Sequence, residues 1–160
     1  MKPSAARAST AIAADEHPGR HQHLIAADPA RSSKPHASRR EHRETPRGAE
    51  PVYYTLQNIS EFWNVATRPT ANNGLGFSVG LALGELSKIE RFLTILPDSP
   101  AVYGEWKRLV PRHSVLGTKV HDARLVATMN IYSIRRILTF NTDDFSRYDI
   151  EAVHPSTLLP

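Results

Sequence analysis

The sequence contains no cysteine, which excludes disulfide bonds and thiolate metal sites. It also lacks an apolar run of membrane-spanning length, the hydrophobic stretch of a secretory signal, and a Gly-rich phosphate loop of the Walker or Rossmann kind. From these absences we expect a soluble cytoplasmic protein that makes no membrane contact. They give no support to a nucleotide-binding fold built on such a loop.

Aromatic residues are absent from the first fifty positions, where the only large aliphatic residues are Ile12, Leu24 and Ile25. This segment carries nine Lys or Arg against six Asp or Glu. Such a composition buries too little apolar surface to offset the entropy of ordering the chain. We therefore expect residues 1–46 to be disordered and residues 47–160, which hold every Trp, Tyr and Phe, to form the folded domain. The basic pI of the chain comes mainly from the first part and does not indicate nucleic-acid binding by the domain.

The apolar residues of the second part predict strands that alternate with helices. Short β-branched, aromatic or aliphatic runs predict strands at residues 52–55, 137–140 and 152–153. Apolar residues recur at helical spacing in residues 56–67, 78–97, 99–110 and 119–132. Strands separated by helices indicate an α/β fold with a parallel sheet.

Asp122 stands on the same helical stripe as Leu125, Val126 and Met129, so a carboxylate heads an apolar face. This position is typical of a functional carboxylate, but also of a first-turn Asp stabilised by the helix dipole, an effect of under about 1 kcal/mol. His121 is adjacent on the helix and points about 100° away, so we interpret it as positional.

Asp144 and Asn141 follow the strand predicted at 137–140, and the carboxyl ends of parallel strands commonly place ligands. A turn or capping role explains these residues equally well. Glu61 projects away from the apolar stripe of its predicted helix. Taken alone, it is more typical of a solvated charge on a helix face.

Together, three motifs give these residues more weight. The stretches Tyr54–Pro69, Val120–Ala127 and Ile137–Phe145 contain Gln-Asn-Ile-Ser-Glu-Phe-Trp, Val-His-Asp-Ala-Arg and Leu-Thr-Phe-Asn-Thr-Asp-Asp-Phe in that order. In sequence and order they closely resemble PIN-domain proteins of the VapC toxin type, over roughly residues 48–155.

The resemblance implies a three-layer α/β/α sandwich on a parallel sheet, and a Mg²⁺- or Mn²⁺-dependent ribonuclease that cleaves RNA. It also implies an antitoxin protein as partner, and homodimers are common in the family. By the same resemblance, Glu61 matches the second acidic position, Asp122 the third and Asp144 the fourth, with Asn141 as an alternative metal ligand. Hard divalent cations take oxygen ligands, and carboxylates from distant segments can jointly hold such an ion beside a scissile phosphate.

The family normally begins with a central hydrophobic strand that ends in Asp-Thr-Asn, and this chain has no Asp-Thr-Asn. Asp15 and Asp28 follow no strand-like run, and we assign neither as a ligand. We therefore expect the first, central strand to be missing and nuclease activity to be weak or absent. One alternative is a non-catalytic relic that binds an antitoxin or RNA without cleavage. Another is that the basic N-terminal segment is a nucleic-acid arm or a targeting sequence.

Codon degeneracy suggests an origin for the missing motif. Arg20 to Leu24 can be encoded as CGA-CAC-CAA-CAT-CTT, which reads Asp-Thr-Asn-Ile one nucleotide later. The same shift can convert Asp15 to Gly19 into Met-Ser-Ile-Leu-Val, a start followed by a hydrophobic strand. Our hypothesis is that residues 1–46 are translated out of frame.

The nucleotide sequence of the gene tests this hypothesis directly. We expect the codons of residues 15–24 to contain the shifted reading Met-Ser-Ile-Leu-Val-Asp-Thr-Asn-Ile. Any synonymous choice that destroys this reading contradicts the hypothesis.

Overall fold

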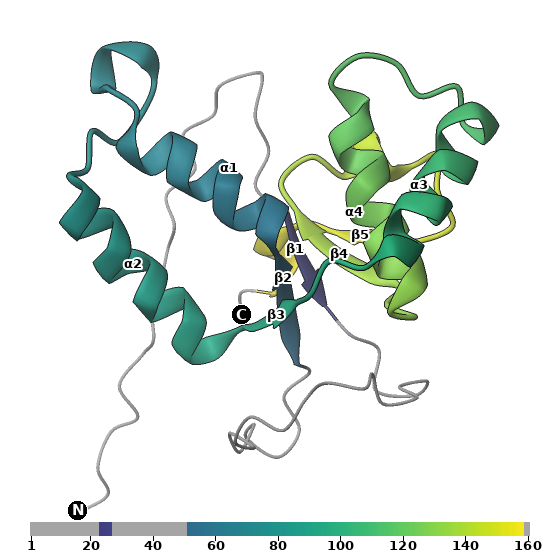
Figure 1. The fold of residues 1–160 in the computed structure, drawn as a ribbon, viewed down its shortest axis with the longest axis horizontal. Helices are drawn as coiled ribbons and strands as arrows, with labels where there is room; N and C mark the ends of the chain where they lie inside the picture. The colour runs from purple at the N-terminus through teal and green to yellow at the C-terminus, as the bar shows by residue number, and fades with distance from the viewer. Residues whose placement is uncertain (1–22, 27–50, 159–160) are drawn as a thin grey trace, which may run out of the picture.

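The protein has a mixed α/β fold in a computed structural model that describes residues 23–26 and 51–158 (Figure 1). The four α-helices of the described part are α1 (Leu56–Thr67), α2 (Val79–Phe92), α3 (Pro100–Arg112) and α4 (Lys119–Ile131). Its five strands are β1 (His23–Ala26), β2 (Val52–Thr55), β3 (Thr94–Leu96), β4 (Arg136–Thr139) and β5 (Glu151–Val153). Its three short 3₁₀ helices are η1 (Thr70–Asn72), η2 (Thr142–Phe145) and η3 (Pro155–Leu158). None of these helices combines the length and the apolar character needed to cross a membrane.

The strands form one sheet in the order β3-β2-β1-β4-β5. β2 pairs with β3 in parallel, and β4 pairs with β5 in parallel, whereas β1 runs antiparallel to both of its neighbours. The sheet is therefore mixed, and the prediction of an all-parallel sheet is wrong at β1.

The centre of the sheet is also occupied, so the prediction that the central strand is missing is wrong. Ile25 lies opposite Tyr53 of β2 on one side and Ile137 of β4 on the other. β1 contains Leu24 and Ile25, the two adjacent large aliphatic residues of the first fifty positions. Its backbone pairs with β2 and β4, which would otherwise present unpaired backbone groups. The other residues of the segment 1–46, which we expect to be disordered, lie outside the described part.

Helix α1 begins directly after β2 because Thr55 caps it. The backbone N–H of Asn58 donates to the Thr55 hydroxyl at 3.3 Å, and the Asn58 side chain accepts from the Thr55 backbone N–H at 2.8 Å. This reciprocal pair satisfies donors that an uncapped helix would leave open. The cap sets the position of the first two turns of α1, which carry Gln57 and Glu61.

The prediction of a helix that continues to Pro97 is wrong over its last residues. α2 ends at Phe92, Leu93 takes an extended conformation, and Thr94–Leu96 form β3 beside β2. Apolar residues continue at helical spacing through this segment, so periodicity could not show the change. Backbone pairing with β2 outweighs the local helical pattern.

Helices pack on both sides of the strands, with α1 and α2 on one side and α3 and α4 on the other (Figure 1). The larger core joins α3 and α4 to β4, and its largest fully buried side chains include Leu125, Met129, Ile137 and Phe145. A smaller cluster holds α1 against α2 through Phe62, Ala66 and Ala82. The core therefore fixes α4 against β4 and η2, the two segments that carry Asp122 and Asp144.

A proline in β1 tests whether this strand holds the sheet together. We expect Ile25→Pro to abolish the cooperative thermal transition in circular dichroism, because proline removes a ladder N–H at a position paired on both sides. Ile25→Val, which keeps a β-branched apolar side chain and the backbone N–H, is the matched control and should melt close to the parent. Equal melting curves for the parent and Ile25→Pro would contradict the central role of β1.

Candidate functional site

Three segments that are distant in the sequence meet at one edge of the sheet. α1 starts where β2 ends at Thr55, and η2 starts shortly after β4 ends at Thr139. β1 aligns these two strand ends, because Ile25 lies opposite the middle of both strands. The start of α4 joins them through a hydrogen bond in which Gln57 Nε2 donates to the His121 carbonyl at 3.1 Å.

Glu61 is held by Gln57, which lies one helical turn earlier on α1. Gln57 Nε2 donates to Glu61 Oε1 at 3.0 Å, and Gln57 itself is buried. The amide oxygen of Gln57, Oε1, and the second carboxylate oxygen of Glu61, Oε2, are buried and have no hydrogen-bond partner in the described part of the chain. Glu61 is half-buried, so a fully solvated charge does not describe it.

Asp122 and Asp144 meet at the ammonium group of Lys119. Lys119 Nζ bonds to Asp144 Oδ1 and lies 3.9 Å from Asp122 Oδ2. Asn141 Nδ2 donates to Asp144 Oδ2 at 2.7 Å. Asp122 is only 7% exposed, as its place at the head of an apolar stripe predicts. A cation thus lies between the two carboxylates.

The four residues predicted as metal ligands are neighbours, but they do not form a closed ligand shell. Lys119 joins Asp122 to Asp144, and Asn141 bonds to Asp144. Glu61 reaches this group only through Gln57 and the His121 carbonyl. In residues 23–26 and 51–158, no three His, Asp or Glu side chains lie close enough to hold a metal ion together.

Tyr148 adds a buried hydroxyl near Asp122. Burial raises the pKa of the Tyr148 hydroxyl, and the negative charge of Asp122 raises it further, while Arg147 acts in the opposite direction. The hydroxyl oxygen is buried without a hydrogen-bond partner in the described residues. The Tyr148 hydroxyl therefore stays neutral.

The donor atoms at this edge fit a hard divalent cation. Every candidate ligand presents oxygen, from the carboxylates of Glu61, Asp122 and Asp144 and from the side-chain amide of Asn141. Buried oxygens without hydrogen bonds are rare in folded proteins, and Glu61 Oε2 is such an atom. A bound cation would satisfy it.

The motifs did not point to Gln57 and Lys119. Each precedes a predicted acidic residue at helical spacing, Gln57 by four positions and Lys119 by three, so both pairs share a helix face. This helical spacing is the sequence feature from which the contacts of Gln57 and Lys119 with the acidic residues could have been predicted. His121 contributes its backbone carbonyl and has an exposed side chain, in agreement with the positional role expected for it.

Removal of the Lys119 charge tests the convergence of Asp122 and Asp144. We expect Lys119→Met to lower the melting temperature, because the neighbouring carboxylates of Asp122 and Asp144 then repel each other. The Lys119–Asp144 ion pair is partly exposed, so the free energy of unfolding should fall by about 1 kcal/mol. Addition of MnCl₂ should restore the melting temperature of this variant more than it raises that of the parent. Lys107→Met, an exposed lysine on α3, is the control for a lost surface charge. Identical metal responses of Lys119→Met and the parent would contradict the arrangement.

The chain matches no protein-family model and no curated protein. The resemblance to PIN-domain proteins therefore rests on the three sequence motifs.

Proposed function

We propose that this chain is a divalent-metal-dependent ribonuclease of the VapC toxin type, with an incomplete set of metal ligands. The observation that carries the proposal is the buried, unpartnered Oε2 of Glu61, held by Gln57 next to the segment that presents Asp122. A bound cation would satisfy this oxygen, as would a water molecule.

The architecture supports a PIN-like α/β/α sandwich as the fold. Helices cover both sides of the strands, and two parallel strand pairs flank a central strand (Figure 1). The antiparallel direction of β1 is a departure from the parallel sheet that the resemblance implies.

In the proposed site Asp122 and Asp144 would hold Mg²⁺ or Mn²⁺, with Glu61 as a further ligand. When bound, the ion would supply an activated water and charge stabilisation at a scissile RNA phosphate. Asn141 orients Asp144 through its 2.7 Å hydrogen bond, and Gln57 orients Glu61 in the same way. Lys119 keeps Asp122 and Asp144 from repelling each other before an ion binds.

A second candidate function is binding of RNA or an antitoxin without cleavage. It is favoured by the absence of Asp-Thr-Asn and by the direction of β1, whose last residue, Ala26, pairs with Val52 and Arg136. These two residues start β2 and β4, so β1 ends at the edge of the sheet opposite the candidate site. A strand that ends there does not deliver a fourth carboxylate to the site.

The surface of α2 supports the protein-partner part of the proposal. The large apolar residues exposed on α2 and on the adjoining β3 are Val79, Leu81, Leu83, Phe92 and Ile95. Exposed apolar side chains that gather on neighbouring elements are typical of protein interaction sites. An antitoxin or a second copy of the chain would cover them.

Calorimetric titration with Mn²⁺, run beside an RNA-cleavage assay, tests the function. We expect weak Mn²⁺ binding and slow Mg²⁺-dependent cleavage, both lost in Asp122→Asn because that substitution removes a ligand charge. Asp98→Asn is the control, since Asp98 is an exposed aspartate paired with Arg124.

The two assays separate the candidates. Mn²⁺ binding without any RNA cleavage would select the non-catalytic function over the ribonuclease. Mn²⁺ binding and cleavage that persist in Asp122→Asn would contradict the proposed site.

A further inference from the structure

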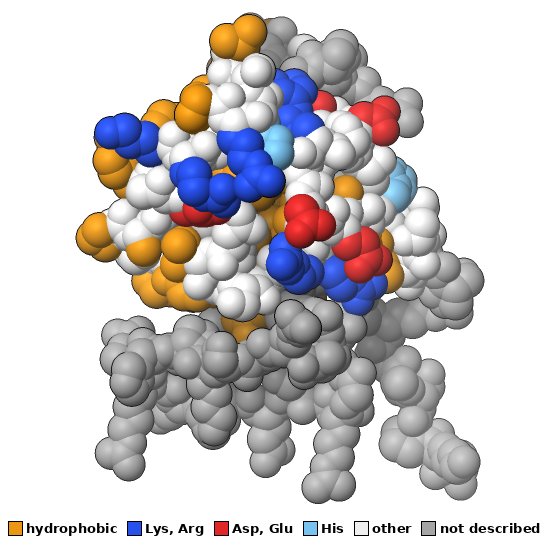
Figure 2. Space-filling model, turned by 90° about the vertical axis from the view of Figure 1, so that its right-hand side faces the viewer, with side chains coloured by type: hydrophobic (Ala, Val, Ile, Leu, Met, Phe, Trp, Pro, Cys, Tyr) orange, Lys and Arg blue, Asp and Glu red, His pale blue; other side chains and the backbone are white. Residues whose placement is uncertain are grey.

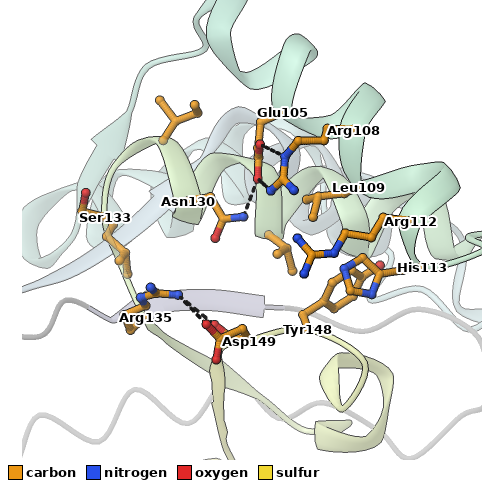
Figure 3. A pocket seen from close by; sticks show the side chains of 13 residues that line it. Glu105, Arg108, Leu109, Arg112, His113, Asn130, Ser133, Arg135, Tyr148 and Asp149 are labelled. Atoms are coloured by element: carbon orange, nitrogen blue, oxygen red, sulfur yellow. Dashed lines mark hydrogen bonds and ion pairs between the residues drawn. The ribbon is translucent and has the colours of Figure 1, made fainter.

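A cavity lies on the α3 and α4 side of the molecule, and Tyr148 forms part of its wall. It measures about 650 Å³ and is enclosed by the second half of α3, the end of α4, the turn that follows it, and Tyr148 and Asp149 (Figure 3). None of the predicted metal ligands lines it. Figure 2 shows that Lys and Arg side chains gather on this side of the molecule, with a few Asp and Glu side chains close by.

Three arginines line this cavity, and two of them are neutralised. Glu105 accepts from Arg108 Nη2 at 2.6 Å and from Arg108 Nε at 2.8 Å. Arg135 Nη1 donates to the Asp149 carbonyl at 3.0 Å and lies 3.3 Å from Asp149 Oδ2. The hydrogen bond from Arg108 lowers the pKa of Glu105, which therefore stays ionised and cancels the charge of its partner.

Arg112 is the arginine that remains. Within the described residues it makes no hydrogen bond and no ion pair, although it is close enough to Glu105 to act on its charge. Figure 3 shows the Arg112 guanidinium directed into the cavity, between the two neutralised pairs. A guanidinium in this setting presents a planar set of donors that suits a phosphate or a carboxylate.

The wall beside Arg112 is apolar and partly aromatic. Leu109, Val126, Ile134 and Tyr148 are all buried side chains that line it. The rings of His113 and Tyr148 are in contact, with centroids 4.9 Å apart and an angle of 57° between their planes. The cavity thus combines the exposed guanidinium fork of Arg112 with the half-buried ring of His113, on which a planar group can stack.

We propose that this cavity binds a nucleoside monophosphate moiety, with the phosphate on Arg112 and the base against the ring of His113. Pockets of about 300–1,000 Å³ are typical for small organic ligands, and one nucleotide falls within this range. An extended acidic peptide fits less well, because the two ion pairs Arg108–Glu105 and Arg135–Asp149 flank the cavity and leave a single unpaired guanidinium.

The moiety can come from RNA or from a free nucleotide. Val126 lines the cavity and lies one helical turn after Asp122 on α4, so the cavity and the candidate metal site share this helix. In the first case the cavity holds a nucleotide that flanks the scissile phosphate, and this case rests on the proposed ribonuclease function.

Titration with AMP, GMP and inorganic phosphate by calorimetry tests the proposal in the absence of divalent metal. We expect the mononucleotides to bind and inorganic phosphate to bind more weakly, because it lacks the stacking group. Arg112→Ala should weaken mononucleotide binding about tenfold or more, because a charge-assisted bidentate contact is lost. Arg112→Lys should fall between this variant and the parent, since it keeps the charge without the fork. Lys107→Ala, an exposed lysine on α3 outside the cavity, should bind as the parent does.

Fluorescence anisotropy of a short labelled RNA in EDTA then identifies the source. Loss of RNA binding in Arg112→Ala but not in Lys107→Ala assigns the cavity to an RNA nucleotide. Equal RNA binding by both variants, together with mononucleotide binding that depends on Arg112, assigns it to a free nucleotide.

Three results would overturn the proposal. These are no mononucleotide binding at millimolar concentration, equal losses in Arg112→Ala and Lys107→Ala, and preference for a poly-glutamate peptide over AMP and GMP. Because these measurements need neither metal nor cleavage, failure of the ribonuclease assay leaves them unaffected. A melting curve of Arg112→Ala that matches the parent shows that the fold is kept.

Discussion

The backbone pairing of β1 with both β2 and β4 is the interaction on which the described structure depends. β2 with β3 and β4 with β5 form two parallel pairs, and β1 is the strand that joins them into one sheet. Without it, two internal edges of hydrogen-bonding groups would face each other unpaired. The candidate site draws Glu61 from the element after β2 and Asp144 from the element after β4. The relative position of these carboxylates is therefore set by a strand that contributes no ligand.

Lys119 offsets part of the negative charge at the candidate site. Two carboxylates near one another in a partly buried place repel each other, and this repulsion favours a cation between them. Lys119 supplies that cation from within the chain, and Gln57 supplies an N–H to Glu61. A divalent ion would have to compete with the amine of Lys119. The three carboxylates would therefore bind a divalent ion more weakly than they would without Lys119.

Local patterns in the sequence identified most helices well. The apolar stripes place α1 and α4 almost to the residue. Patterns failed where long-range pairing decides the structure. β3 continues a helical apolar period, and β1 lies in a segment whose composition argues against folding. In both cases pairing with a neighbouring strand, which no local window contains, determines the conformation.

The candidate site was predictable in its acidic members and not in its polar partners. Glu61, Asp122, Asn141 and Asp144 are the metal-ligand positions of the motifs. Gln57 lies in the first motif without an assigned role, Lys119 lies just before the second, and only the tertiary contacts show what these two residues do. The cavity around Arg112 could not be foreseen, because it is formed by the ends of α3 and α4 and the loop before β5. Which of its arginines is unpaired depends on the positions of Glu105 and Asp149.

Tyr148 lines the cavity around Arg112, and the charge of Asp122 acts on its neutral hydroxyl. A ligand that moved this ring would change the electrostatic environment of Asp122. Thermodynamic linkage requires such an effect to be reciprocal, so an ion bound by Asp122 would change the affinity of the cavity by the same factor. In that case, one aromatic side chain would couple the two proposed sites without any change in the backbone.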